Sequence, residues 1–125
     1  MLTEQKWLGV LGLPEPEHLI SAESVENGKP DPACYRLGRE RLGIHADDKN
    51  VLVLEDAPAG IRAGKAAGCK VIGLVTSHTV EEVLAAGPDW IVRDLSSVRL
   101  VPSAAKGDAR VTLEIWDGLV VKSVV

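Results

Sequence analysis

Three short segments of the chain consist only of apolar residues and glycine. They are Val51–Leu54, Val71–Val75 and Trp90–Val92, and none alternates apolar with polar residues as a half-exposed strand does. Runs of this kind are typical of the strands of a parallel sheet, which have other elements packed on both faces. We therefore expect a parallel sheet in which Val51–Leu54 is a central strand, buried on both faces.

Segments with helical signals alternate with these strands. Asp31 and Pro32 suit the N-cap and the first position of a helix, and Thr79 opens a capping-box pattern. Gly60 and Gly64 give another helix a bare stripe that allows close packing on a sheet. The predicted helices cover residues 2–11, 32–42, 57–67 and 80–86. Helices that alternate with parallel strands indicate a layered α/β domain.

The tail of the chain has a different pattern. Val111–Ile115 alternates apolar with polar residues, and Asp117-Gly118 then precedes the apolar run Leu119–Val121, which is typical of a β-hairpin with a two-residue turn. His18–Ala22, near the other end, is a further strand candidate. We expect residues 1–101 to form the sheet and its helices, and residues 102–125 to form a connector and a hairpin packed on the same domain.

The composition narrows the classes of function. The chain has 125 residues, which suits one domain, and a net charge of −4 without a basic run that could follow a nucleic-acid backbone. Its longest apolar runs have the length of strands, too short to cross a membrane. Cys34 and Cys69 stand in different kinds of segment, so we expect free thiols in the reducing cytoplasm, with Cys69 buried at the start of a strand.

Two adjacent acidic residues follow the first of the apolar strands. Glu55 and Asp56 stand at the carboxyl end of Val51–Leu54, the end at which open parallel sheets bind ligands. A divalent cation relieves the repulsion between neighbouring carboxylates, and Mg²⁺ needs one or two of them besides water and phosphate oxygens. The alternative is that the pair caps the following helix, since acidic residues are favoured at a helix N-terminus.

Lys29 is the candidate for phosphate binding. It lies in a Gly-Lys-Pro loop, and a lysine in such a place acts as a point charge on a phosphate group. The alternative is a solvated surface lysine. Asp31 is better explained as a helix cap than as a ligand. Residues 77–79 could line a cleft, but a loop and a helix cap explain them better.

Taken together, these segments resemble one family. Residues 25–32 (VENGKPDP) and 51–68 (VLVLEDAPAGIRAGKAAG) are similar to the haloacid dehalogenase superfamily of phosphatases, and the likeness extends from about Leu8 to the end of the chain. EDAPAGI, GKAAGC and the tail look most similar to its fungal glycerol-phosphate and 2-deoxyglucose-6-phosphate phosphatases. The resemblance implies that Lys29 stabilises charge on a phosphate, that Glu55 and Asp56 hold Mg²⁺, and that the substrate is a small sugar or polyol phosphate.

The resemblance also implies parts that this sequence lacks. The family's nucleophile is the first aspartate of an Asp-x-Asp motif, whereas the aspartates here stand at 31, 47, 48, 56, 89, 94, 108 and 117, no two of them separated by one residue. By this comparison residues 1–101 are the C-terminal portion of the core domain, without its first two strands and without the cap that selects substrates. We expect no turnover by this chain alone, because no aspartyl-phosphate can form.

Three functional hypotheses remain. The chain is the C-terminal part of a phosphatase, a non-catalytic protein that keeps half of the site, or a structural protein that docks through an open sheet edge. Under the first, which we favour, the chain binds Mg²⁺ weakly and a small phosphorylated metabolite only when complemented. Because Val51–Leu54 would lack a neighbour on one edge, we expect self-association or binding of an N-terminal fragment there.

Overall fold

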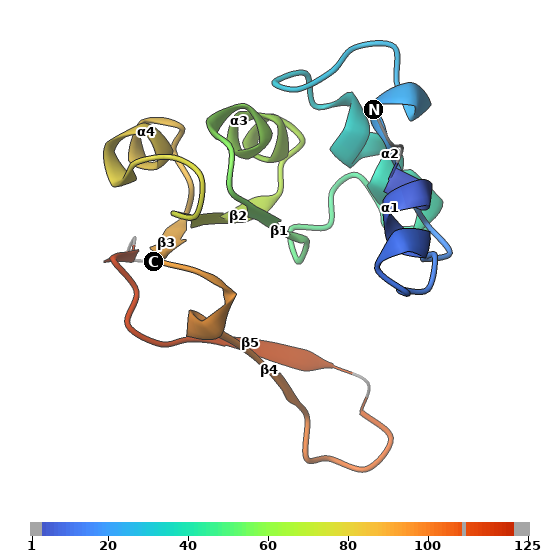
Figure 1. Ribbon diagram of the computed structural model, residues 1–125. Helices are drawn as coiled ribbons and strands as arrows, with labels where there is room; N and C mark the ends of the chain where they lie inside the picture. Colours follow the sequence, from blue (N-terminus) through green and yellow to red (C-terminus); the bar gives the residue numbers. More distant parts are fainter. Residues whose placement is uncertain (1–3, 109, 122–125) are drawn as a thin grey trace.

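The protein combines a mostly parallel sheet, flanking helices and a separate β-hairpin (Figure 1). The computed structural model describes residues 4–108 and 110–121. The helices are α1 (Glu4–Val10), α2 (Ala33–Arg41), α3 (Pro58–Ala66) and α4 (Val80–Ala85), with 3₁₀ turns at Ala22–Ser24 and Leu95–Ser97. The strands are β1 (Leu52–Glu55), β2 (Lys70–Leu74), β3 (Trp90–Val92), β4 (Val98–Pro102), β5 (Val111–Ile115) and β6 (Val120–Val121). None of the helices in the described ranges is long and apolar enough to span a membrane.

The main sheet has the order β1-β2-β3-β6. β1, β2 and β3 are parallel, with Val53 opposite Val71 and Ile72 opposite Trp90, and β6 joins β3 antiparallel. The predicted fold class, a parallel sheet with flanking helices, is confirmed. The bounds of β1 and β2 differ from the predicted ones by a single residue, and those of β3 agree.

The core lies between this sheet and the helices α3 and α4, which cover one of its faces (Figure 1). Ile61, Val71 and Val83 are fully buried there, and Cys69 is 2% exposed, as expected for a thiol at the start of a strand. Gly64 lets α3 approach closely, because a Cβ at this position would lie 2.9 Å from Val71 Cγ2. The predicted bare stripe on this helix is therefore used for packing.

The opposite face of the sheet is less covered. The β4–β5 hairpin lies beneath it (Figure 1), and a hollow of about 590 Å³ remains between β5 and the sheet. Leu54 is 44% exposed, whereas Val53 beside it is 7% exposed. Successive residues of a strand point to opposite faces, and the face of β1 that α3 covers is the buried one. The prediction that Val51–Leu54 is buried on both faces is therefore wrong.

The strand predicted at His18–Ala22 does not form. The chain there leads into the 3₁₀ turn at Ala22–Ser24, and its side chains pack on α2 instead. A Cβ on Gly38 would lie 3.4 Å from Ile20 Cδ1, and Arg41 donates a hydrogen bond to the Leu19 carbonyl at 3.5 Å. A strand needs a neighbour to pair its backbone groups, and the described part of the chain places none beside this segment.

The tail contains strands where they were predicted, but their partners differ. β5 pairs with β4 to form the hairpin, and β6 leaves it to pair with β3. The predicted hairpin between Val111–Ile115 and Leu119–Val121 is therefore wrong. Asp117, with a positive φ of 50°, turns the chain away from β5, and the Leu119 amide then donates to the Ile91 carbonyl at 2.8 Å. The alternation of side chains predicts a strand without specifying its partner.

The predicted starts of α2 and α4 agree with the structure to within one residue. Thr79 Oγ1 accepts a hydrogen bond from the Glu82 amide at 3.2 Å, as an N-cap does. At α2 the N-cap residue is Pro32, and Asp31 Oδ1 accepts from the Ala33 amide at 2.9 Å from one position further out. The first helix, predicted over residues 2–11, is described over 4–10, and residues 2 and 3 lie outside the described ranges.

A buried arginine fastens α2 to the rest of the molecule. Arg39 is 6% exposed, and its guanidinium donates to the Ala67 carbonyl at the end of α3 at 2.9 Å. It also donates to the carbonyls of the loop after α2, those of His45, Ala46 and Asp48. Carbonyl oxygens at a helix C-terminus carry partial negative charge, which suits a cation. These bonds hold α2 beside the end of α3 and fix the loop that leads from α2 toward β1.

Candidate functional site

The candidate site is built around the carboxylate of Glu55, the last residue of β1. Glu55 is 7% exposed because it lies on the strand face that α3 covers. Its Oε1 accepts hydrogen bonds from Lys29 Nζ at 3.0 Å and from the Tyr35 hydroxyl at 2.5 Å. Its Oε2 accepts from the Ala57 amide at 3.3 Å. Three donors from separate parts of the chain therefore compensate the burial of this carboxylate.

Lys29 reaches Glu55 from the loop that precedes α2. The two residues are 26 positions apart in the sequence, yet their side chains form an ion pair. The Lys29 side chain is 46% exposed, whereas that of Glu55 is 8% exposed. An ammonium group has three hydrogens, so Lys29 can donate to a second acceptor on its exposed side while it stays paired with Glu55. This geometry differs from that of a freely solvated surface lysine.

Tyr35 completes the cluster, although it is not among the residues predicted for the site. It lies in the first turn of α2, shortly after the Lys29 loop. Burial raises the pKa of its hydroxyl above the ordinary value of 10.0, and the hydrogen bond to Glu55 raises it further. The hydroxyl is therefore a proton donor at neutral pH. Its place one turn after the loop was the only available signal.

Asp56 has different partners from its neighbour. Its Oδ2 accepts a hydrogen bond at 2.7 Å from the hydroxyl of Ser77, which follows β2. The Ser77 oxygen also lies 2.9 Å from Nδ1 of His78. The ends of two adjacent strands therefore meet at this carboxylate. Residues 77–79 were predicted to be a loop and a helix cap. This is right for Thr79, but the prediction did not include the contact between Ser77 and Asp56.

The capping alternative for the acidic pair is met only in part. The N-cap residue of α3 is Ala57, and no side-chain cap bonds to the first turn of that helix. Glu55 accepts from the Ala57 amide, but its main partners are Lys29 and Tyr35. Asp56 is bonded to Ser77 rather than to α3. Helix capping therefore does not account for the two carboxylates.

The acceptor capacity that remains decides whether the acidic pair fits a cation. Within residues 4–108 and 110–121, no three His, Cys, Asp or Glu side chains converge as a metal cluster. Among the same residues, Asp56 Oδ1 has no hydrogen-bond donor and Glu55 Oε2 has one. Each carboxylate therefore keeps a lone pair. This donor set fits Mg²⁺, which takes one or two protein carboxylates and completes its shell with water and phosphate oxygens.

The chain has clear relatives among known proteins. A family model described as haloacid dehalogenase-like hydrolase matches residues 3–68. Glycerol-1-phosphate phosphohydrolases 1 and 2 of Saccharomyces cerevisiae are 40% and 44% identical over 83% and 77% of this chain, and over 44% and 40% of their own lengths. A HAD family hydrolase from Deinococcus radiodurans, solved with phosphate and sodium, matches with a TM-score of 0.62 at 30% identity, over 71% of this chain and 42% of that one.

The likeness covers only part of each relative, and it includes the predicted site residues of this chain. The chain spans less than half the length of each of these relatives. The segment that the family model matches contains the Lys29 loop and the pair Glu55 and Asp56. The parallel sheet and the helices on its face agree with this likeness. The chain belongs to the haloacid dehalogenase-like hydrolase family.

Proposed function

We propose that this chain is the C-terminal part of a magnesium-dependent phosphatase that acts on small sugar or polyol phosphates. One observation carries the proposal: a half-exposed Lys29 is ion-paired with the buried Glu55 at the sheet edge where Asp56 also lies. The names of its relatives support the substrate class, since they include glycerol-1-phosphate phosphohydrolases and, in Escherichia coli, hexitol phosphatase A.

Lys29 is the residue that would contact the phosphate group. Its ammonium can stabilise the negative charge that develops on the phosphoryl oxygens. The ion pair with Glu55 limits the positions of this side chain. Tyr35 and the Ala57 amide in turn fix Glu55, so the orientation of the Lys29 ammonium group is set by Glu55 and its partners as well as by the lysine itself. A positioned charge is more effective than a mobile one because less reorganisation accompanies the reaction.

Asp56 and Glu55 are the residues that would hold the cation. The chemistry that a bound Mg²⁺ would supply there is that of a Lewis acid. With two protein carboxylates, one of them also paired with Lys29, we expect its affinity for this chain to be low.

The chain should not turn over by itself. The sequence contains no Asp-x-Asp, and both carboxylates at the sheet edge are assigned to Mg²⁺, with Glu55 also paired with Lys29. A lysine and a cation can stabilise charge, but they form no aspartyl-phosphate. The alternative is a non-catalytic member of the family that acts through its open sheet edge.

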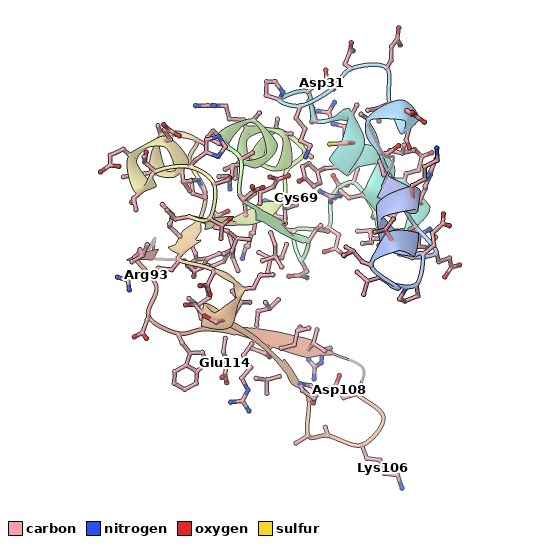
Figure 2. All side chains as sticks on the ribbon, viewed as in Figure 1. Asp31, Cys69, Arg93, Lys106, Asp108 and Glu114 are labelled. Carbon is pink, nitrogen blue, oxygen red and sulfur yellow. The ribbon has the colours of Figure 1, made fainter. Side chains whose placement is uncertain are left out.

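The test uses the purified chain, Mg²⁺ and an aryl phosphate. We expect background hydrolysis from the chain alone. Addition of the part of the yeast glycerol-1-phosphate phosphohydrolase 1 that lies outside the 44% matched by this chain should give magnesium-dependent turnover. Lys29→Met should lower that turnover about 100-fold or more. Lys106→Met is the matched control, since Figure 2 shows Lys106 in the hairpin turn, far from the helices and the sheet edge.

Two outcomes would contradict the proposal. Magnesium-dependent turnover by the chain alone, lost in Asp56→Asn, would require a different nucleophile. A mixture in which the two parts bind each other without any turnover would favour the non-catalytic alternative.

A further inference from the structure

Ser77 bridges two strand ends at the candidate cation site. Its hydroxyl oxygen lies 2.7 Å from Asp56 Oδ2 and 3.5 Å from the Asp56 carbonyl, although 21 residues separate them. On its other side it lies 2.9 Å from His78 Nδ1. Ser77 follows β2 and Asp56 follows β1, which are neighbours in the sheet.

Counting protons fixes the direction of these bonds. An ionised carboxylate has no hydrogen, so the short contact to Asp56 requires the Ser77 hydroxyl as donor. A hydroxyl has one hydrogen, and its oxygen must therefore accept from His78 Nδ1–H. The resulting chain of donors runs from His78 through Ser77 to Asp56 and ends on a single carboxylate oxygen, Oδ2.

This bond leaves the two oxygens of Asp56 unequal. Oδ2 is engaged, whereas Oδ1 accepts no hydrogen bond from the described residues. A cation that used both oxygens would share Oδ2 with the Ser77 hydroxyl and compete with it for the electron density of that oxygen. Mg²⁺ takes carboxylates through one oxygen in a small octahedral shell, whereas the larger Ca²⁺ readily takes both oxygens of one carboxylate.

We propose that Ser77 is a positioning residue that makes Asp56 a one-oxygen ligand and thereby favours Mg²⁺ over Ca²⁺. The inference rests on the proposed function in so far as Asp56 is taken as a cation ligand. Ser77 itself contacts neither the cation nor the substrate. Its removal should raise the relative affinity for Ca²⁺, because Oδ2 of Asp56 is then free of the competing hydrogen bond.

The test is to titrate the full chain with Mg²⁺ and, separately, with Ca²⁺. Binding is monitored through the amide NMR shifts of Asp56 and Ser77, which can detect weak ligands. Ser77→Ala should raise the ratio of Ca²⁺ to Mg²⁺ affinity about tenfold. This is the lower end of the change in metal affinity that usually follows the loss of a residue hydrogen-bonded to a metal ligand. Ser77→Thr, which keeps a hydroxyl, should retain the wild-type ratio. Thr76→Ala removes a neighbouring hydroxyl that has no described contact with Asp56 and should change nothing.

Each result separates this inference from the proposed function. An unchanged ratio in Ser77→Ala, with cation binding intact, would overturn the role of Ser77 and leave the phosphatase proposal standing. Wild-type protein that binds neither cation would overturn both this inference and Asp56 as a ligand. Ser77→Cys provides a second variant in case alanine disturbs the loop: its weaker S–H donor should give an intermediate ratio.

Discussion

The α-carbon of Gly60, in the first turn of α3, lies directly against the carboxylate of Glu55. A Cβ built on Gly60 would lie 2.1 Å from Glu55 Cδ and 2.2 and 2.3 Å from its two oxygens. Contacts this short cannot exist, so any side chain here must displace the carboxylate. The absence of a side chain at Gly60 is therefore what gives the end of β1 room for an ion pair with Lys29.

Gly60→Ala should destabilise the protein for this reason. Glu55 can move away from a new methyl group only by giving up hydrogen bonds in a buried place. We expect the free energy of unfolding to fall by about 2 kcal/mol, the range for overpacking a well-packed interior. Urea denaturation measures it. Gly38→Ala is the control, because its new Cβ meets Ile20 at an ordinary 3.4 Å and alanine is the better helix former. Equal stability of Gly60→Ala and wild type would contradict this account of the site.

The ionisation of Tyr35 offers a second test, made simple because the sequence contains one tyrosine. Burial and the contact with Glu55 raise the pKa of this phenol in the folded protein above its ordinary value of 10.0. A raised folded pKa means that its contribution to stability is fully present below about pH 10 and is lost as the pH rises toward the folded pKa. We expect tyrosinate absorbance to appear only when the protein unfolds in alkali.

Tyr35→Phe supplies the comparison for that titration. The variant should lose the part of the alkaline decline in stability that comes from this phenol. A tyrosine that titrates near pH 10 in protein that is still folded would show that the hydroxyl is not held by Glu55.

Arg39 should matter more than its neighbours on α2. Arg39→Met would remove the buried guanidinium that donates to the carbonyls of Ala67 and of the loop after α2. Hydrogen bonds from a charged donor contribute more to stability than neutral ones, so we expect a loss of about 3 kcal/mol in the free energy of unfolding. Arg36→Met, on the exposed side of the same helix, should cost little. Thermal unfolding of the two variants side by side checks this, and equal losses would contradict it.

The free edge of β1 leads to a prediction about association. No strand in the described part of the chain pairs with the outer side of β1, and a groove of about 270 Å³ runs between this edge and α2. Unpaired backbone groups at an apolar edge favour pairing with another chain. We expect light scattering to show concentration-dependent self-association, or binding of an N-terminal fragment when one is supplied.

Charge at this edge should oppose association. Leu54→Lys should reduce it, whereas Leu84→Lys on α4 should not, although the two leucines are 44% and 45% exposed. A monomer at all concentrations, unaffected by either substitution, would exclude the edge as a docking surface.

The strands of the main sheet could be predicted from the sequence because their apolar runs are local signals. β1, β2 and β3 each combine branched aliphatic residues with a glycine or a charge at the boundary. The pairing of the tail could not be predicted, because the partner of a strand depends on the route of the whole chain. The strand predicted at His18–Ala22 does not form for the same reason. The apolar side chains of this segment pack on the surface of α2 without strand pairing.

The candidate site shows the same division. The family resemblance assigned Lys29 and Glu55 to one phosphate and magnesium site, and the structure pairs them at 3.0 Å. Tyr35 and Ser77 were missed because their contacts depend on how α2 packs and on where the turn after β2 leads. The sequence therefore predicted the same role for Asp56 and Glu55, that of a Mg²⁺ ligand. In the folded protein the two carboxylates have separate sets of hydrogen-bond partners.

The route of the chain between β3 and β6 has a practical consequence. The chain leaves the sheet for the β4–β5 hairpin and returns to the same edge, so the hairpin is a side branch of the sheet. Its turn holds Lys106 and Asp108 at the end farthest from the helices (Figure 2). A peptide epitope or a fluorescent reporter spliced into this turn would lengthen the branch without shifting the register of the sheet. The turn therefore offers a place to attach a probe that reports on the whole chain while the Lys29 and Glu55 pair stays intact.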